Sequence, residues 1–318
     1  MDGISHAPPG QPGRGKNLVI SRLPFVRCAF VPRTPATERL ILPLGQFERK
    51  VPLVGRDRAI ARAANAAPFE LVKTNLCGLR ADRILFPVGL TDRVERTLAA
   101  AGYAVTRRTL ESDRQDPPAP GWDIPRWDLL EAEFSYRYRQ KELLQQMVAH
   151  EDGQFRCTTG AGKTLMMMYF AFLHPLARVL IVAKAELLST TIYPVVSQIP
   201  NVGLFTSAKQ CNLGARVLCW SADSLHRLDP QRFDFVLVDE ADQAVVDSYA
   251  LSLMRFGRCR LYGLSGSFGH RSDGLGVREE AIFGPVRFSL DGEEGIREKL
   301  VSKVYIVWRS LHGEDPTE

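Results

Sequence analysis

Residues 156–170 read RCTTGAGKTLMMMYF. Gly160 and Gly162 come just before Lys163 and Thr164, and the chain then becomes an apolar run rich in helix formers. A glycine-rich turn that leads into a helix exposes successive backbone N–H groups, which attract phosphate oxygens together with the helix dipole. The lysine can reach the β- and γ-phosphates of a nucleotide, and the threonine hydroxyl can coordinate Mg²⁺.

The loop departs at one position from the general phosphate-binding pattern G-x-x-x-x-G-K-[ST], because Cys157 occupies the place of the first glycine. Taken alone, the loop therefore leaves a second interpretation open, which is a chance Gly-Lys-Thr at the start of a helix. We expect the three methionines that follow, Met166, Met167 and Met168, to pack in the core against a sheet.

The segment FDFVLVDEADQ (233–243) contains an acidic pair, Asp239 and Glu240, which strengthens the prediction of a nucleotide-binding site. A carboxylate at the C-terminal end of a parallel strand lies at the sheet edge where ligands bind, so Asp239 can hold Mg²⁺ there. Glu240 can orient and deprotonate the attacking water. An acidic pair alone could be a simple helix cap. In combination with the lysine loop, it predicts ATP or a related nucleoside triphosphate bound with Mg²⁺.

Apolar segments typical of buried strands alternate with helical stretches from about Leu129 onward. The expected strands are 178–183, 216–220, 233–238 and 260–264. Near-continuous apolar strands separated by helices predict an α/β fold whose parallel sheet is covered by helices on both faces. We place this domain at 129–290, and we expect residues 291–318 to lead into a second domain that this sequence does not contain.

A small α/β or α+β accessory module is expected at 21–113. Its candidate strands are 25–31, 70–74 and 103–109, with an alternating segment at 40–53. A helix is expected at 91–101, with Thr91 as its N-cap. Residues 1–20 are rich in Gly and Pro and predict a disordered tail. The stretch ESDRQDPPAPGWDIP (111–125) contains prolines that interrupt helices and central strands, so we expect a linker at 114–128.

Charge is unevenly distributed along the chain. Residues 1–120 hold 19 Lys and Arg against 11 Asp and Glu, whereas the remainder holds 22 against 25. The basic first part makes the accessory module a candidate for binding nucleic acid, with a solvated basic surface as the alternative. The six cysteines form no C-x-x-C pair, which favours free thiols in a reducing compartment, such as the cytoplasm of a bacterial or phage-infected cell. No apolar stretch approaches the ~20 residues of a membrane span.

Together the motifs resemble those of the superfamily-2 helicases and translocases over about residues 134–308. CTTGAGKT is similar to motif I, VDEADQ to motif II, and GLSGS (263–267) to motif III. FSYRYRQ resembles the Q-type motif that reads adenine, with Gln140 as its glutamine. FGRCRLYGLSGSFGHRSDG and IFGPVRFSL point to the branch that contains XPB and phage UvsW. The resemblance implies a RecA-like ATP-binding domain with a P-loop and a DEAD-type motif.

The resemblance also implies a role for each matched residue. Catalysis is expected from Lys163, Asp239 and Glu240. ATP is expected to contact Gln140, Thr159, Gly160, Ala161, Gly162, Lys163 and Thr164, and Mg²⁺ to contact Thr164 and Asp239. Coupling between ATP and nucleic acid is expected from Asp242, Ser265 and Ser267, and candidate nucleic-acid contacts are Lys184, Ser221 and Arg271. Phe134 or Tyr138 could stack on the base, whereas Trp220 fits a core position as well as a nucleic-acid face.

The sequence departs from the family pattern in three places. Motif III has glycine and serine at Gly266 and Ser267 where alanine and threonine are usual, and Lys184 with Ala185 replaces a frequent Pro-Thr. The family motor also needs a second RecA-like lobe, whose motif VI arginines reach the γ-phosphate, and no such pattern occurs here. We therefore expect slow hydrolysis by this chain alone and a second lobe supplied by another chain.

Two hypotheses of function follow. The chain is the ATP-binding half of a DNA (or RNA) helicase or translocase, or it is an ATP-dependent nucleic-acid-binding or regulatory module without motor activity of its own.

Overall fold

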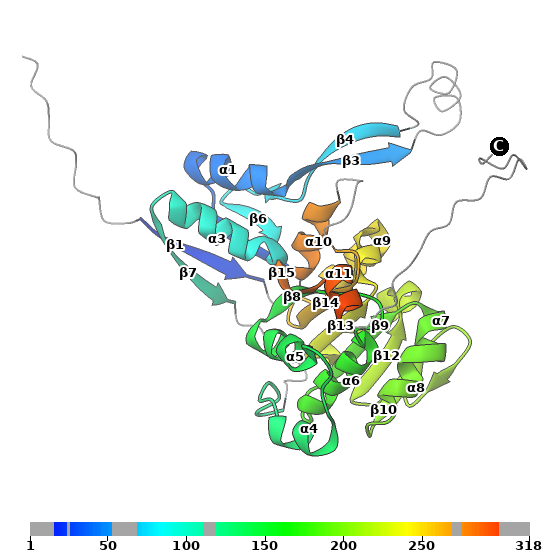
Figure 1. The fold of residues 1–318 in the computed structure, drawn as a ribbon. Helices are drawn as coiled ribbons and strands as arrows, with labels where there is room; N and C mark the ends of the chain where they lie inside the picture. The colour runs from blue at the N-terminus through cyan, green and yellow to red at the C-terminus, as the bar shows by residue number, and fades with distance from the viewer. Residues whose placement is uncertain (1–15, 24–25, 53–68, 111–118, 269–274, 299–318) are drawn as a thin grey trace, which may run out of the picture.

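The computed structural model describes residues 16–23, 26–52, 69–110, 119–268 and 275–298. These residues form two sheets and a separate two-stranded ribbon (Figure 1). We call the first part, residues 16–110, the accessory module, and the second part, residues 119–298, the large domain. No helix within the described ranges is long and apolar enough to cross a bilayer.

The large domain is built on one sheet, which has eight strands in the described part of the chain. Their order is β11-β10-β12-β9-β13-β14-β8-β15, and neighbours are parallel except β10 and β11. The strands are β8 (Asp152–Cys157), β9 (Val179–Ala183), β10 (Val202–Phe205), β11 (Gln210–Cys211), β12 (Val217–Ser221), β13 (Phe235–Asp239), β14 (Arg260–Ser265) and β15 (Val286–Leu290). The predicted α/β fold with a parallel sheet is confirmed.

Helices cover both faces of this sheet (Figure 1). The helices are α4 (Trp127–Glu133), α5 (Gln140–Ala149), α6 (Lys163–Leu173), α7 (Ala185–Leu187), α8 (Tyr193–Val196), α9 (Asp247–Met254), α10 (Gly276–Phe283) and α11 (Gly292–Arg297). Alternate side chains of a strand point to opposite faces. In β13, Leu237 joins the apolar cluster under α5 and α6, whereas Val236 joins the cluster under α9 and α10. Because both faces are buried, the central strands β9, β12 and β13 are almost entirely apolar.

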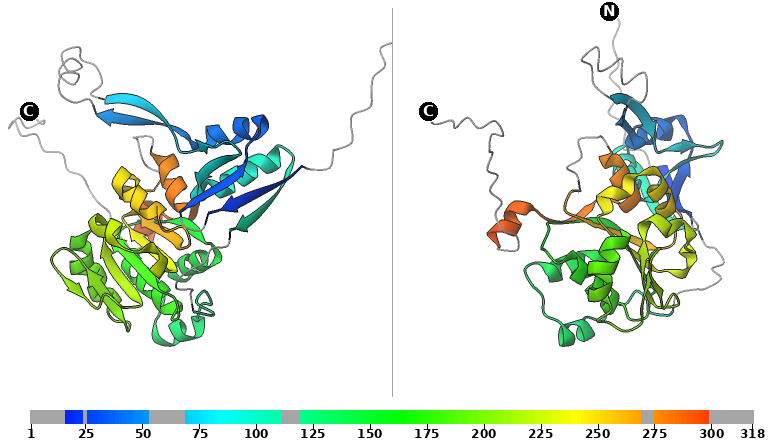
Figure 2. Two further views of the ribbon diagram at one scale, coloured as in Figure 1. Left: turned by 180° about the vertical axis from the view of Figure 1, so that it is seen from behind. Right: turned by 90° about the vertical axis from the view of Figure 1, so that its right-hand side faces the viewer.

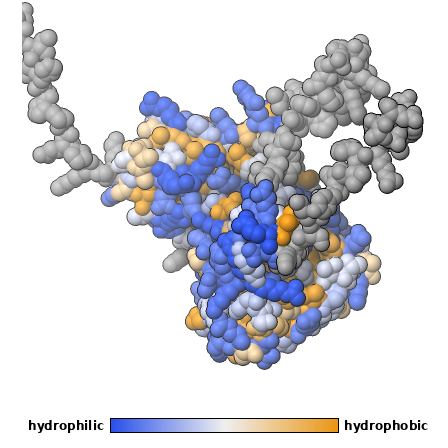
Figure 3. Space-filling view, in the orientation of Figure 1, coloured by the Kyte–Doolittle hydropathy of each residue, from blue (hydrophilic) through white to orange (hydrophobic). Residues whose placement is uncertain are grey.

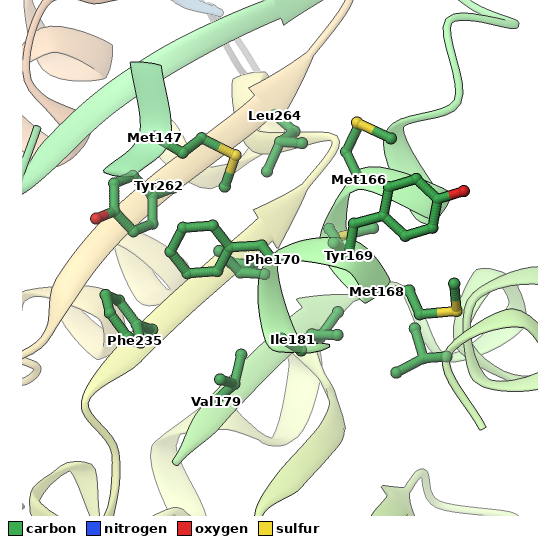
Figure 4. Close-up of a cluster of buried hydrophobic side chains, with 14 of the residues drawn as sticks. Met147, Met166, Met168, Tyr169, Phe170, Val179, Ile181, Phe235, Tyr262 and Leu264 are labelled. Atoms are coloured by element: carbon green, nitrogen blue, oxygen red, sulfur yellow. The ribbon is translucent and has the colours of Figure 1, made fainter. Parts of the chain in front are cut away.

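The methionines of α6 lie in the first of these clusters. Met166, Met167 and Met168 are at most 1% exposed. In Figure 4, Met166 lies beside Tyr169, and Met168 lies nearer to the strand residue Ile181. The prediction that they pack in the core is confirmed, and they anchor the helix that begins at Lys163.

The accessory module has a five-stranded sheet in the described residues, with the order β5-β6-β2-β1-β7. Its elements are β1 (Lys16–Arg22), β2 (Cys28–Pro32), α1 (Pro35–Ile41), β5 (Gly78–Leu79), β6 (Arg83–Pro87), α3 (Thr91–Ala100) and β7 (Tyr103–Thr109). A ribbon of β3 (Gln46–Pro52) and β4 (Phe69–Asn75) extends from this module (Figure 1). The strands expected at 70–74 and 103–109 are present, as is the helix at 91–101.

Several boundaries in this first part differ from the prediction. Residues 16–20, expected in a tail, belong to β1, where they pair with β7. The alternating segment 40–53 is a strand only from Gln46, because a capping box of Thr34 and Thr37, with Pro35 as the first helical residue, starts a helix ahead of it. Thr91 is not an N-cap: its hydroxyl donates to the Val88 carbonyl at 2.6 Å, from inside the helix. The strand expected at 25–31 is β2, and Phe25 lies outside the described residues.

The end of the expected linker 114–128 also differs, because it packs against the large domain. The Trp122 ring lies 5.0 Å from that of Phe235 in β13, and α4 already begins at Trp127. Residues 111–118 lie outside the described ranges.

The two parts of the molecule meet in a tight junction, which Figure 2 shows from two further sides. Arg27, just before β2, is fully buried and pairs with Asp152 of β8 at 2.8 Å. Its guanidinium also donates to the Cys259 carbonyl at 3.1 Å. A Cβ atom on Gly89 would lie 2.0 Å from the Glu280 carbonyl oxygen of α10, so the backbones approach as closely as glycine allows. The junction is therefore a packed part of the structure.

Candidate functional site

The glycine-rich loop joins the end of β8 to the start of α6. Gly160 and Gly162 have φ values of 85° and 87°, which glycine adopts without the strain that a Cβ atom brings. Cys157, at the place of the first motif glycine, is 1% exposed, and burial raises the pKa of its thiol to about 12. The cysteine is accommodated because its side chain packs in the core.

Lys163 lies at the first position of α6, below this loop. Its ammonium is 3.5 Å from the Cys157 carbonyl oxygen, so the side chain folds back along the loop. Thr164 follows on the first turn and is half-buried. The N-terminus of α6, the backbone of the loop and the lysine therefore form one cradle for anionic groups.

Asp239 is the last residue of β13, at the sheet edge, and the charge of Lys163 acts on its carboxyl. Its carboxyl is 8% exposed, and its Oδ1 atom is buried without a hydrogen-bond partner among the described residues. Burial raises the pKa of this carboxyl, while the charge of Lys163 opposes the shift and that of Glu240 adds to it. A buried carboxylate oxygen without a partner is unfavourable unless a cation or donor satisfies it. Carboxylate oxygen is a ligand that Mg²⁺ prefers, so this position fits the predicted ion, and the contact expected from Thr164 stays a prediction.

Glu240 has an unusual backbone. Its φ of 48° and ψ of 45° lie in the left-handed region, which non-glycine residues rarely occupy. Such strain costs about 1–3 kcal/mol and persists where the surroundings hold the residue in place. Its side chain is half-buried next to Asp239 and is available to act on a ligand at the sheet edge.

A hydrogen-bonded chain links the neighbouring strand to the acidic motif. Ser265, the last residue of β14, donates to Asp242 Oδ1 at 2.6 Å. The Ser265 and Ser267 hydroxyls are 3.1 Å apart, and the Ser267 amide donates to Ser265 Oγ. The hydroxyls of the altered motif III thus reach the acidic motif, and their coupling role stays a prediction.

Gln140 connects the start of α5 to the glycine-rich loop. Its Nε2 donates to the Ala161 carbonyl at 3.1 Å, and its Oε1 accepts from the Arg137 amide at 2.8 Å. The side chain is 4% exposed, and because a primary amide has two donors and two acceptor lone pairs, one of each is left unused by these two bonds. A donor next to an acceptor matches the Hoogsteen edge of adenine.

The two aromatic candidates for base stacking have different surroundings. Phe134 is half-buried at the edge of the core, where its ring packs at 4.8 Å on Tyr169 and at 5.3 Å on Phe172. Tyr138 is 38% exposed and lies two residues before Gln140. Tyr138 is therefore the one of the two whose ring is accessible.

The candidate nucleic-acid residues are not equally placed. Lys184 is exposed directly after β9. Ser221 is only 2% exposed, because it is still part of a central strand, so its side chain does not reach the surface. Trp220 stacks on Phe205 with ring centroids 3.8 Å apart and is a core residue. Arg271 lies outside the described residues.

A cavity of about 420 Å³ lies beside the acidic pair. Lys184 and the pair Asp239 and Glu240 line it, together with His226 and Tyr249. His226 and Tyr249 could not be predicted as site residues from the sequence, because neither belongs to a recognisable spacing pattern. They join the site only through the folding of α9 and of the 3₁₀ turn after β12.

Comparison with known proteins supports the fold. No protein-family model matches the chain, and no curated protein matches it in sequence. A crystal structure of the UvsW helicase from bacteriophage T4 aligns with a TM-score of 0.62 and 14% identity, over 86% of this chain and 99% of that one. A second T4 UvsW structure aligns with a TM-score of 0.61 and 14% identity, over 86% of this chain and 57% of that one. The expected resemblance to the superfamily-2 helicases is confirmed at the level of the fold.

Proposed function

We propose that the chain binds ATP with Mg²⁺ between the loop 157–164 and the pair Asp239 and Glu240. The observation that carries this proposal is the buried, unpartnered Oδ1 of Asp239 at the sheet edge, with Lys163 opposite it. The triphosphate would lie along the loop amides and the N-terminus of α6. Asp239 and Thr164 would hold the ion, which shields the charge of the phosphates when bound.

Each of the other residues has a defined task in this site. Lys163 leaves the Cys157 carbonyl and turns to the β- and γ-phosphates. Glu240 accepts a proton from the attacking water, for which its fixed backbone provides the orientation. Gln140 reads the adenine edge with its remaining donor and acceptor.

We further propose that ATP turnover moves the protein on nucleic acid, most simply DNA. In support, the fold is that of a protein named as a helicase, and Lys184 is exposed at the sheet edge next to the acidic pair. Hydrophilic residues cover much of the described surface in Figure 3. The accessory module contributes exposed basic residues that can contact phosphates without reading sequence, namely Arg33, Arg39, Lys73, Arg80, Arg96 and Arg108.

A motor of this type also needs a second RecA-like lobe whose arginine reaches the γ-phosphate. The described residues form one such sheet, and the chain spans 57% of the second UvsW structure. An arginine finger contributes roughly 10³–10⁵ in rate in P-loop enzymes. We propose that full activity requires this lobe, on the same polypeptide or on another.

Two substitutions test the ATP site. Lys163→Ala should abolish binding of ATP·Mg²⁺, because it removes the one side-chain cation of the cradle. Glu240→Gln should bind ATP as before and lower kcat by at least about 100-fold, because it removes the proton acceptor. Calorimetry measures binding, and phosphate release with and without duplex, single-stranded and branched DNA measures turnover.

Lys209→Ala is the matched control, because it removes an exposed lysine far from the loop. Unchanged turnover in Glu240→Gln would show that the proton acceptor is elsewhere. Binding without DNA-stimulated turnover, even with a second lobe present, would favour a regulatory ATP-binding module over a motor.

A further inference from the structure

The segment just before Gln140 is held by a helix from the other end of the described chain. In α11, Glu294 accepts a hydrogen bond from the Tyr138 hydroxyl at 2.7 Å. Both Glu294 carboxylate oxygens also accept from Arg139 Nη1, at 2.9 and 3.1 Å. The carboxylate and the guanidinium are 21% and 28% exposed, so water screens this pair only in part.

Arg139 is a strained residue. Its φ of 51° lies in the left-handed region, directly before the first residue of α5. For a side chain with a Cβ atom this conformation costs about 1–2 kcal/mol, so other contacts must maintain it. They come from its guanidinium, which pairs with Glu142 and Glu294, donates to the Ser289 carbonyl and lies 4.8 Å over the Phe288 ring.

A continuous series of direct contacts therefore runs from α11 to the glycine-rich loop. Glu294 holds Tyr138 and Arg139, and Gln140 is the next residue. Gln140 in turn bonds the Ala161 carbonyl of the loop. Without Glu294, the backbone at Arg139 can relax toward the right-handed region, and such a change displaces Gln140.

We propose that Glu294 is a positioning residue of the base site: it holds Tyr138 and Arg139 so that Gln140 presents its free donor and acceptor to adenine. The same contacts make α11 responsive to nucleotide, because a base that moves Tyr138 or Gln140 also moves the partners of Glu294. This inference rests on the proposed ATP site and assigns it a specificity element that no sequence motif contains.

The position of Glu294 explains why no motif reveals it. It lies more than 150 residues from Tyr138 in sequence, on a short helix that Asp291 caps through a hydrogen bond to the Glu294 amide. Guanine offers two acceptors on its Hoogsteen edge where adenine offers a donor and an acceptor. A correctly placed amide therefore distinguishes the two bases, whereas a displaced amide does not.

The test is the ratio of the affinities for ADP·Mg²⁺ and GDP·Mg²⁺, measured by calorimetry. Glu294→Ala should weaken ADP binding about three- to tenfold, the loss expected for one or two displaced hydrogen bonds, and leave GDP binding unchanged. Tyr138→Phe, which removes only the hydroxyl, should produce a smaller change in the same direction. A loss of structure alone would weaken both nucleotides equally and leave the ratio unchanged.

Glu293→Ala is the matched control, because Glu293 is an exposed neighbour on the same helix. Hydrogen exchange provides a second measurement. ADP should change the protection of amides 292–297 in the parent protein and in Glu293→Ala, but not in Glu294→Ala. If Glu294→Ala unfolds the protein, Glu294→Gln, which keeps the acceptor oxygen but not the charge, serves in its place.

The outcomes separate the two proposals. If the parent protein binds neither nucleotide, the ATP site itself is wrong, and this inference is wrong with it. If the parent prefers ADP and Glu294→Ala keeps the same affinity ratio and the same exchange response, the ATP site stands and the role of Glu294 is wrong.

Discussion

His174 shows how burial sets the chemistry of a single side chain in this protein. It is 1% exposed, and its ring lies 4.7 Å from those of both Phe170 and Phe235. Burial lowers the pKa of the imidazole to about 4, and the charge of Arg260 adds to the shift. The folded protein therefore keeps His174 neutral at a pH where the unfolded chain is already protonated.

This difference predicts an acid-sensitive stability. The unfolded imidazole takes up a proton near pH 6.5, whereas the folded one does so only near pH 4. Stability should be complete above pH 6.5 and fall by up to about 3 kcal/mol as the pH drops toward 4. His174→Phe should remove this part of the pH dependence, and urea unfolding at pH 7.5 and 5 measures it. His226→Gln, at an exposed histidine, is the control, and a pH dependence that persists unchanged in His174→Phe would contradict the assignment.

For other residues, the position in the fold decides whether the side chain can contact a ligand. Cys157 departs from the expected motif, yet its side chain packs in the core and the loop keeps its path. Ser221 matches a motif position but is buried, whereas Lys184 matches one and is exposed. A pattern of letters predicts which residues belong to a site, and burial decides which of them can touch a ligand.

The loop between β8 and α6 is the element whose conformation matters most. Its two left-handed glycines bring the backbone amides around to the start of the helix. Gly162 has little space for a side chain, since an added Cβ would lie 2.7 Å from Gln140 Nε2. The close packing of Gln140 against the loop therefore requires a residue without a side chain at position 162.

Gly162→Ala should disturb both the conformation of the loop and the position of the Gln140 side chain. The left-handed backbone costs about 1–2 kcal/mol with alanine, and the new methyl group pushes the Gln140 amide away from Ala161. Affinity for ATP·Mg²⁺ should fall at least about tenfold, as measured by calorimetry, with a small loss of thermal stability. Gly214→Ala is the control, because a Cβ there meets no atom within 4 Å. Equal affinities of the two variants would mean that the loop does not need this conformation.

Three strands that the sequence did not predict, β1, β8 and β15, lack the continuous apolar pattern of central strands: β1 begins with Lys16 and Asn17, β8 contains Asp152, Gln154 and Arg156, and β15 contains Arg287. A fourth, β10, is apolar but has only four residues. They form strands by pairing with neighbouring strands, as β8 does with β14 and β15. Their formation depends on tertiary contacts more than on local propensity.

At the scale of the whole molecule, the accessory module and the large domain are joined through buried groups. Arg27 and Asp152 form a buried ion pair, and Ala281 of α10 lies in the apolar cluster of the accessory module. Asp152 also accepts from the Leu261 amide, so one carboxylate holds the starts of β8 and β14. The opposite ends of these strands lead to the glycine-rich loop and to Ser265.

Arg27→Met should therefore destabilise the whole protein. Removing one partner of a buried pair leaves the other charge uncompensated and costs about 3–5 kcal/mol. We expect one cooperative unfolding transition in the parent and a large fall in its Tm in the variant, measured by calorimetry. Arg33→Met, which breaks the more exposed pair with Glu38, should cost less than about 1 kcal/mol. Two separate transitions in the parent, only one of them sensitive to Arg27→Met, would show that the parts fold independently.

The central parallel strands, the loop before α6 and the acidic pair after β13 could be predicted from the sequence, because they depend on local patterns of apolar residues, glycine and charge. The inward packing of Cys157, the burial of Ser221 and the distant partners of Arg27 and Glu294 became visible only in the folded protein. Burial and long-range pairing depend on how strands and helices pack together. No short segment of the chain contains that information.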